Sequence, residues 1–374
     1  MNKKLTWVVV LIIIVGGYFL LQNKPQPATG EPIKVGFMGA LTGDAATLGV
    51  SIKAAVELAR DEINAAGGVN GRPIELVSED SECDAKAATN AASKLMTIDK
   101  VVAVIGGLCS SETLAAAPLA NSNQVPLISY SSTNPQITSA GDYVFRFIPS
   151  DTFQGKFAAE YVVNTLAKKN VAILYCLSDW CVGIKDVFKG RLAEIGGSVV
   201  AEEGYAQESR DLRSQITKIK AANPDIVYFL GYTEASIVGL KQLKELGVTA
   251  PILGGDAWDD PKIPEGAGAV ANGAQFTTAG GKELSAAFVT EVKARSGGVE
   301  TNTYTGRGYD ILKALTQIMK NTGPDSVAIK DALYSVKNYN GVADTYTLDA
   351  NGDVTTAVYI IREYQDGKII TVEK

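Results

Sequence analysis

The sequence of 374 residues contains no histidine. This absence excludes Ser-His-Asp and Cys-His nucleophile systems, and any zinc site that needs an imidazole ligand. The formal net charge is -6, whereas nucleic-acid binding depends on basic patches, so we expect no nucleic-acid partner. No nucleophile–base pair is visible. The stretch "LDANGDV" at 348–354 faintly resembles a calcium loop, but it lacks the downstream glutamate spacing of an EF-hand, and Asn351-Gly352 is better interpreted as a hairpin turn. We therefore expect no catalytic residue, no metal and no cofactor.

The N-terminal segment has one long apolar run. Lys3 and Lys4 precede apolar residues from about Leu5 to Leu21, which is typical of a membrane-targeting segment whose N-terminus stays in the cytoplasm. The run is near the lower limit of roughly 17 residues for a spanning helix. No small-x-small cleavage site and no lipid-bearing cysteine follows it, which favours an uncleaved anchor over a cleaved signal peptide. In either case the chain beyond the proline-rich spacer "QNKPQPATGEP" is exported.

Four cysteines in an exported chain predict disulfides. Three pairings are possible. Cys176 and Cys181 are close in sequence, and Cys83 and Cys109 each follow an apolar run, at the mouths of what the pattern predicts to be neighbouring strands. We favour the pairs 83–109 and 176–181 over the other pairings and over free buried thiols.

Short apolar runs alternate with helical periodicity along the exported chain. In the first half, strand-like runs stand at 33–41, 74–80, 101–107 and 125–132. The pattern restarts after Pro149, with strand-like runs at 170–176, 198–205, 225–232 and 250–256. Such alternation predicts an α/β fold with two doubly wound, parallel-sheet lobes. Ligands bind beyond the carboxyl ends of such strands, so we expect a cleft between the lobes.

The stretch "VIGGLCSSET" ends a predicted strand and places Ser110 and Ser111 where the next helix begins. Free N–H groups and the dipole at a helix N-terminus favour an anion, and two hydroxyls suit a carboxylate. Phosphate is disfavoured because the stretch lacks the further glycines and the lysine of a P-loop. The alternative is that at least one serine is only an N-cap.

Two further strand ends carry groups that can bind the carboxylate and an ammonium of such a ligand. In "SSTNP", Thr133 can donate to the same carboxylate, and a backbone carbonyl near Ser132 can accept from an ammonium; a turn before Pro135 is the alternative. Asp256 follows two glycines at another strand end, where a desolvated carboxylate pairs with an α-ammonium. A helix-capping or loop acid is the alternative for Asp256.

Three aromatic residues are candidates for the walls of the cleft. Trp180 lies between two cysteines, and an aromatic plate there can cover an apolar or cationic side chain. Tyr232 and Tyr304 can add further walls. Packing at the interface between the lobes is the alternative for each of them.

Taken in order, longer stretches resemble a known family. "IKVGFMGALTGDAATLGVSIKAAVELARDEINAAGGVNGRPIEL", "SECDAKAATNAASKL", "GGLCSSETLAAAPLA", "PLISYSSTNPQIT" and "YVFRFIPSDTFQG" resemble the leucine/isoleucine/valine-type solute-binding proteins of ABC transporters. The resemblance covers 31–374, more weakly toward the end. It implies the type I periplasmic-binding fold, in which three crossing segments form a hinge between two lobes.

The resemblance also implies where the lobes divide. The crossings are expected near Arg146–Pro149, Gln275–Thr278 and Val342–Thr345. The implied parts are an anchor or signal segment with its linker (1–30), a first lobe (31–147 plus 279–344) and a second lobe (148–278 plus 345–374).

Particular roles follow from the same resemblance. It implies a disulfide between Cys83 and Cys109, and carboxylate recognition by the Ser110 hydroxyl and neighbouring N–H groups. The position of Ser132 offers its carbonyl to the α-ammonium, and Thr133 contacts both ends of the ligand. Asp256 falls where the family carries an acid for the α-ammonium. Trp180 and Tyr232 fall near the aromatic wall of the second lobe.

The chain departs from the family pattern at three positions. Asp256 is shorter than the glutamate of the best-known members. Leu48 stands where an aromatic residue often lines the side-chain pocket. Cys181 replaces a residue that is usually small and uncrosslinked, and a bridge to Cys176 would stiffen the loop that carries Trp180.

The leading hypothesis is an exported, monomeric binding protein for a branched-chain or other apolar amino acid, which delivers its ligand to an ABC transporter permease. The second is a sensing or binding protein for amides, urea or aromatic acids, in which Asp256 has no obvious purpose. The third is an enzyme, which the missing histidine and a bridged Cys109 disfavour.

Overall fold

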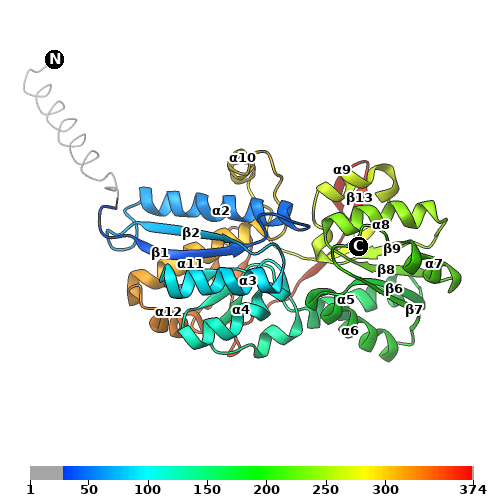
Figure 1. Cartoon of the computed structure of the whole chain (residues 1–374), viewed down its shortest axis with the longest axis horizontal. Coiled ribbons are helices and arrows are strands. Elements are labelled where there is room, and N and C mark those ends of the chain that lie inside the picture. The colour runs from blue at the N-terminus through cyan, green and yellow to red at the C-terminus, as the bar shows by residue number, and fades with distance from the viewer. Residues whose placement is uncertain (1–27, 373–374) are drawn as a thin grey trace, which may run out of the picture.

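The computed structural model describes residues 28–372. The predicted membrane anchor lies outside these residues. Within 28–372, no helix combines the length and the apolar character that crossing a membrane requires. The described chain forms two α/β lobes that lie side by side (Figure 1).

The first lobe is built on a five-stranded sheet in which every neighbouring pair is parallel. Its strand order is β2-β1-β3-β4-β5. The bounds are β1 (Ile33–Gly39), β2 (Ile74–Asp80), β3 (Val104–Ile105), β4 (Leu127–Ser129) and β5 (Val144–Arg146). The first four match the predicted apolar runs; β5 is too short for a recognisable pattern.

The second lobe repeats this construction and adds a hairpin at one edge. Its strand order is β14-β13-β10-β9-β8-β6-β7, parallel except that β13 is antiparallel to both β10 and β14. The bounds are β6 (Asn170–Cys176), β7 (Ser198–Tyr205), β8 (Ile226–Leu230), β9 (Ile252–Gly254), β10 (Gln275–Ala279), β13 (Tyr359–Gln365) and β14 (Lys368–Thr371). The predicted doubly wound fold is confirmed.

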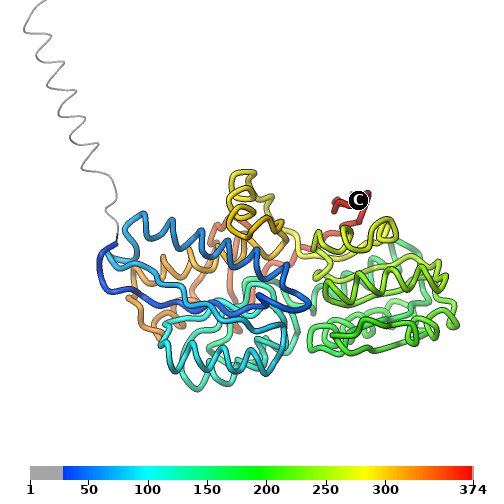
Figure 2. The backbone as a smooth tube through the Cα atoms, turned by 45° about the horizontal axis from the view of Figure 1, so that its top comes forward, coloured from blue at the N-terminus to red at the C-terminus, as the bar shows by residue number. Residues whose placement is uncertain are grey.

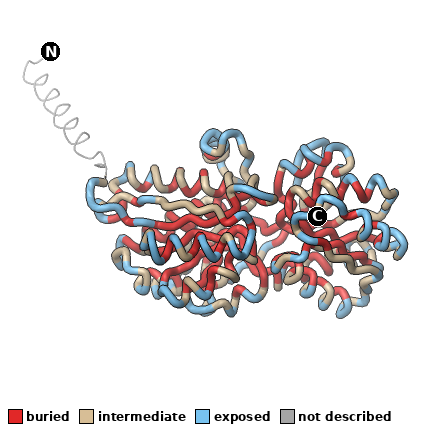
Figure 3. Tube along the Cα trace, in the orientation of Figure 1, coloured by how far each residue is buried: buried red, intermediate tan, exposed pale blue. Residues whose placement is uncertain are grey.

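Helices cover both sheets. Those of the first lobe are α2 (Ala46–Ala65), α3 (Ala85–Ser93), α4 (Ser110–Asn123), α10 (Ala286–Arg295), α11 (Thr305–Thr322) and α12 (Ser326–Leu333). Those of the second are α5 (Asp151–Glu160), α6 (Asp179–Glu194), α7 (Arg213–Ala221), α8 (Thr233–Glu245) and α9 (Lys262–Ala267). α11 packs along α2 although the two are far apart in sequence, so the chain returns to the first lobe (Figure 2). Buried residues fill both sheets and the zone where the lobes meet (Figure 3).

Three segments cross between the lobes. The first runs from β5 to α5, and the second leaves β10 after Ala279. Before the third crossing, the chain stays with the first lobe as far as Asp353, which is further along than expected. Arg146 at the end of β5 donates to both carboxylate oxygens of Asp353, at 2.6 and 2.7 Å. We propose that the third crossing lies between Val354 and Tyr359, later than the expected Val342–Thr345.

The structure contains both favoured disulfides, Cys83–Cys109 and Cys176–Cys181. Cys83 follows β2 and Cys109 follows β3, so the first bridge joins two loops of the first lobe. Cys176 ends β6 and Cys181 lies in the first turn of α6, so the second bridge closes a short loop of the second lobe. Each lobe therefore carries one bridge at the carboxyl end of its sheet.

Candidate ligand-binding site

A small cavity lies between the carboxyl ends of the two sheets. Strand order reverses between β1 and β3 in the first sheet and between β6 and β8 in the second, which is where open α/β sheets leave a crevice. The space left between its lining side chains is small. Both lobes line it, through Leu48, Leu108, Ser110, Ser131, Trp180, Tyr232, Asp256, Ala257 and Tyr304.

Most of the predicted ligand-binding residues meet at this cavity. Those that line it are Leu48, Ser110, Trp180, Tyr232, Asp256 and Tyr304. Ser111, Ser132 and Thr133 do not line it, and Leu108, Ser131 and Ala257 were not predicted. The last three are neighbours of predicted residues within the same strand-end stretches.

Ser110 is the first residue of α4, and Cys109 rather than either serine is the N-cap. The Ser110 hydroxyl accepts a hydrogen bond from the backbone N–H of Asn134 at 3.1 Å, which leaves its own proton to donate elsewhere. The first N–H groups of a helix have no acceptor within the helix. Ser111 instead lines a separate groove, beside Asp179. The site thus has one serine, Ser110, at the start of α4, where its hydroxyl proton and the first backbone N–H groups of the helix are free to donate.

Glu112 fixes the loop in front of α4. Its buried carboxylate accepts from the Ser81 hydroxyl at 2.7 Å and from the backbone N–H groups of Cys83, Leu108 and Cys109 at 2.9, 2.6 and 2.9 Å. Desolvation raises the pKa of Glu112, and these bonds oppose the rise. Because Glu112 bonds both cysteines of the first bridge, it holds the start of α4 in position.

Ser129, at the end of β4, decides which of the following serines faces the cavity. Its hydroxyl accepts from the N–H groups of Ser131 and Ser132, at 3.2 and 2.8 Å. The Ser132 hydroxyl is turned away and lies 2.7 Å from Thr113 Oγ1 and 3.0 Å from the carbonyl oxygen of Cys109. The Ser131 side chain therefore lies at the cavity, and the role of the Ser132 backbone carbonyl stays a prediction.

Asp256 opens the short turn that follows β9 and is buried. Within residues 28–372 its Oδ1 has no hydrogen-bond partner. Burial raises the pKa of Asp256 to about 6, although polar contacts with Tyr304, Gln154 and Trp180 lower it. A desolvated carboxylate with an unpaired oxygen is an acceptor in need of a cation.

A second buried carboxylate, Asp151, lies close to Asp256. It is the first residue of α5, and neither of its oxygens has a hydrogen-bond partner in the described part of the chain. Burial and the charge of Asp256 raise the pKa of Asp151 well above its usual value, while Thr133 and Arg146 act in the opposite direction. The prediction missed Asp151, although it stands at a crossing segment in the quoted stretch "IPSDTFQG".

Aromatic rings form the second-lobe wall. The rings of Trp180 and Tyr232 lie 5.1 Å apart, centre to centre, at an angle of 43°. Trp180 also lies on Gly255, where a Cβ atom would be 2.9 Å from the indole ring. Glycine at 255 thus lets the indole pack directly on the backbone that leads to Asp256.

The lobes contact each other at the rim of the cavity. Asp44, after β1, forms an ion pair with Arg210, after β7. Asn134, after β4, donates its side-chain N–H to the backbone carbonyl of Asp179 at the start of α6, at 2.5 Å. These contacts cross from one lobe to the other, so the structure is in a closed arrangement.

Comparison with known proteins agrees with this architecture. Residues 32–368 match the profile of a family described as periplasmic binding protein. The chain belongs to the periplasmic binding protein family. It is therefore an extracytoplasmic binding protein of the type that serves ABC transporters, and not an enzyme.

Two curated relatives are similar over most of the chain. An amino acid binding protein of Pseudomonas aeruginosa is 29% identical, covering 89% of this chain and 90% of the relative. A Leu/Ile/Val-binding protein homolog of Brucella melitensis is 26% identical, covering 91% and 94%.

Solved structures of periplasmic binding proteins superpose closely. The branched-chain amino acid binding protein LivJ of Streptococcus pneumoniae, in complex with isoleucine, is 30% identical with a TM-score of 0.83, covering 91% of this chain and 99% of that one. A solute-binding protein of Rhodopseudomonas palustris in complex with benzoate has a TM-score of 0.82 at 21% identity, covering 92% and 96%, and shares the fold alone.

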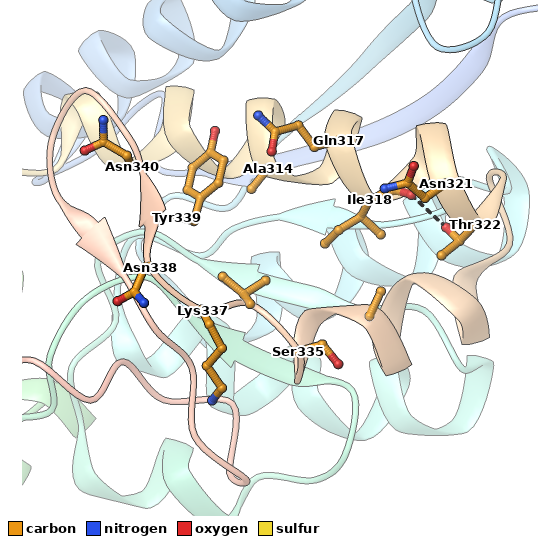
Figure 4. Close-up of a pocket in the computed structure, with 12 residues that line it drawn as sticks. Ala314, Gln317, Ile318, Asn321, Thr322, Ser335, Lys337, Asn338, Tyr339 and Asn340 are labelled. Atoms are coloured by element: carbon orange, nitrogen blue, oxygen red, sulfur yellow. Dashed lines mark hydrogen bonds between the residues drawn. The ribbon is translucent and has the colours of Figure 1, made fainter.

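A larger cavity on the outside of the first lobe does not belong to this periplasmic-binding site. It is an open hollow between α11, α12 and the segment 335–340, and Gln317, Asn321 and Tyr339 lie along it (Figure 4). All of its residues come from one lobe, and none follows the carboxyl end of a strand in either large sheet. Closure of the lobes cannot enclose a ligand there.

Proposed function

We propose that this protein captures an α-amino acid with an apolar, branched side chain in the cavity between its lobes and delivers it to an ABC transporter permease. The observation that carries the proposal is Asp256, a buried carboxylate with one oxygen unpaired in the described part of the chain, across the cavity from the donors at Ser110. A carboxylate on one wall and N–H and hydroxyl donors on the other complement an ammonium and a carboxylate.

The rest of the lining supports an apolar side chain. Leu48 and Leu108 come from the first lobe and Ala257 from the second, and none of them adds a polar side-chain atom. The aromatic pair Trp180–Tyr232 closes the second-lobe side. The isoleucine bound by LivJ, a relative of known structure, is a ligand of this type.

Lobe closure is the step that traps the ligand. Ser110 and Asp256 lie on different lobes, so a ligand that touches both stabilises the closed arrangement, whereas one that touches a single lobe does not. The closed, ligand-loaded form would then dock on the permease. We also propose that the protein acts as a monomer held at the outer face of the membrane by residues 1–30.

An aromatic acid is the second candidate ligand, because a fold relative holds benzoate. Asp256 argues against it. A benzoate ligand supplies no cation, so the buried Asp256 carboxylate would remain without a counter-charge beside the negative charge of the ligand.

Calorimetric titration with leucine, isoleucine, valine, glutamate, urea and benzoate tests the proposal. We expect the three branched-chain amino acids to bind more tightly than the other compounds. Tight binding of benzoate or urea without binding of any amino acid would overturn it.

A further inference from the structure

The start of α6, in the second lobe, contacts the first lobe across the cleft. The Cys176–Cys181 bridge ties the last residue of β6 to the first turn of this helix. Ser178, inside the bridged loop, is the N-cap, and its hydroxyl accepts from the Cys181 N–H at 3.4 Å and lies 3.1 Å from Cys176 Sγ. We call residues 176–181 the clip.

The clip carries a wall of the ligand cavity. Trp180 lies inside it, lines the cavity and packs on Tyr232 and on the backbone of Gly255. The indole occupies the space that any side chain at 255 would need. Movement of the clip therefore changes the shape of the cavity directly.

The clip also carries part of the closing face. The Asp179 carbonyl accepts the cross-cleft hydrogen bond from Asn134. One turn further along α6, Gly183 lies so close to Asn134 that a Cβ atom there would be 2.5 Å from its amide nitrogen. The first turns of α6 and the segment that begins at Asn134 thus fit together only without a side chain at position 183.

We propose that the Cys176–Cys181 bridge is a positioning device for ligand capture: it holds Trp180 and the Asp179 carbonyl in their closed-state positions before ligand arrives, and so sets ligand retention and the size limit of the cavity. A bridge that closes only a short loop constrains the unfolded chain less than one that closes a long loop. The second bridge is therefore expected to matter more for binding than for global stability, whereas Cys83–Cys109 closes a longer loop.

This inference deepens the proposed function, and its test includes a measurement that needs no ligand. The full-length double variant Cys176→Ala/Cys181→Ala is compared with wild type by acrylamide quenching of tryptophan fluorescence, with Trp180→Phe used to identify the signal of Trp180. We expect quenching of Trp180 to increase in the double variant. Unchanged quenching would overturn the inference, whatever ligand the protein binds.

The binding arm uses leucine and phenylalanine as probes. In the double variant we expect leucine to dissociate about tenfold faster with little change in its association rate, and the preference for leucine over phenylalanine to shrink. Unchanged dissociation and unchanged preference would contradict the inference. A wild type that binds no amino acid would refute the proposed function and leave the quenching result to decide the role of the clip.

Gly183→Ala is the matched variant, because it leaves the bridge intact and obstructs only the closing face. We expect leucine to dissociate faster from it while quenching of Trp180 stays at the wild-type level. If the double variant fails to fold, Gly183→Ala still tests whether the start of α6 forms part of the closing face. Leucine kinetics identical to wild type in Gly183→Ala would show that the start of α6 does not form the closing face.

Discussion

The two walls of the cavity treat their polar groups in opposite ways. In the first lobe, both oxygens of the buried Glu112 accept hydrogen bonds, and the start of α4 is left with spare donors. In the second lobe, Asp256 lines the cavity and is buried, and within residues 28–372 its Oδ1 has no hydrogen-bond partner, so the spare group there is an acceptor.

Ser110 and Asp256 line the same cavity from different lobes. A zwitterion between them satisfies both, because its carboxylate accepts from the donors at Ser110 and its ammonium pairs with Asp256. Closure is then favoured only by a ligand that carries both charges. Substitutions on one wall at a time break this complementarity.

The largest effect is expected from Asp256→Asn. Removing one partner of a buried charge pair costs about 3–5 kcal/mol, so we expect affinity for leucine to fall by at least about 100-fold. Calorimetric titration measures it. Affinity within a factor of a few of wild type would mean that the ammonium is held elsewhere, with Asp151 as the next group to examine.

The same substitution is expected to stabilise the unliganded protein at neutral pH. Burial raises the pKa of Asp256 from 3.8 to about 6, so the folded chain binds its proton more tightly than the unfolded chain does. Stability of the unliganded protein therefore falls as pH rises through that window, and ligand affinity rises over the same window as the carboxylate ionises. Thermal unfolding from pH 4 to 8 checks this; a higher Tm for wild type than for Asp256→Asn at pH 7 would contradict it.

On the donor wall the expected effect is smaller. Ser110→Ala removes one hydroxyl donor to a charged group, worth about 1.5–3 kcal/mol, so we expect a loss of about 10- to 100-fold in leucine affinity. Ser111→Ala is the matched control, since Ser111 lies next to it but lines a different groove. An equal loss in both variants would indicate damage to the start of α4 rather than a lost ligand contact.

The smallest effect is expected at the rim. Asp44 and Arg210 pair across the cleft, with 13% and 43% of their side-chain surface exposed. Exposed ion pairs contribute about 0–1 kcal/mol and are screened by salt. We expect Asp44→Asn to weaken leucine binding by at most about fivefold, and the difference from wild type to shrink at high salt. A difference that does not depend on salt would contradict a purely electrostatic role.

Much of the fold follows from periodicity. Buried parallel strands separated by amphipathic helices leave a pattern that a single sequence carries, and the predicted strands of both lobes are present. The third crossing at its proposed position does not leave such a pattern, because the proposal rests on the contact between Arg146 and Asp353, which are far apart in sequence.

The sequence predicts which strand ends form the candidate site, but not which side chains at those ends face the cavity. In "SYSSTNP", the choice between Ser131 and Ser132 depends on how Ser129 turns the backbone after β4. Asp151 was missed for a related reason. Its burial beside Asp256 results from the packing of the hinge, and a polar residue at a helix start suggests a cap when only the sequence is known.

The central claim is that a zwitterion bridges the two walls. The most direct test is calorimetric titration of wild type with leucine, with isocaproate, which lacks the ammonium, and with isoamylamine, which lacks the carboxylate. The account predicts that leucine binds and that each analogue loses at least about 100-fold in affinity, because each leaves one wall unpaired. Isocaproate binding as tightly as leucine would contradict it.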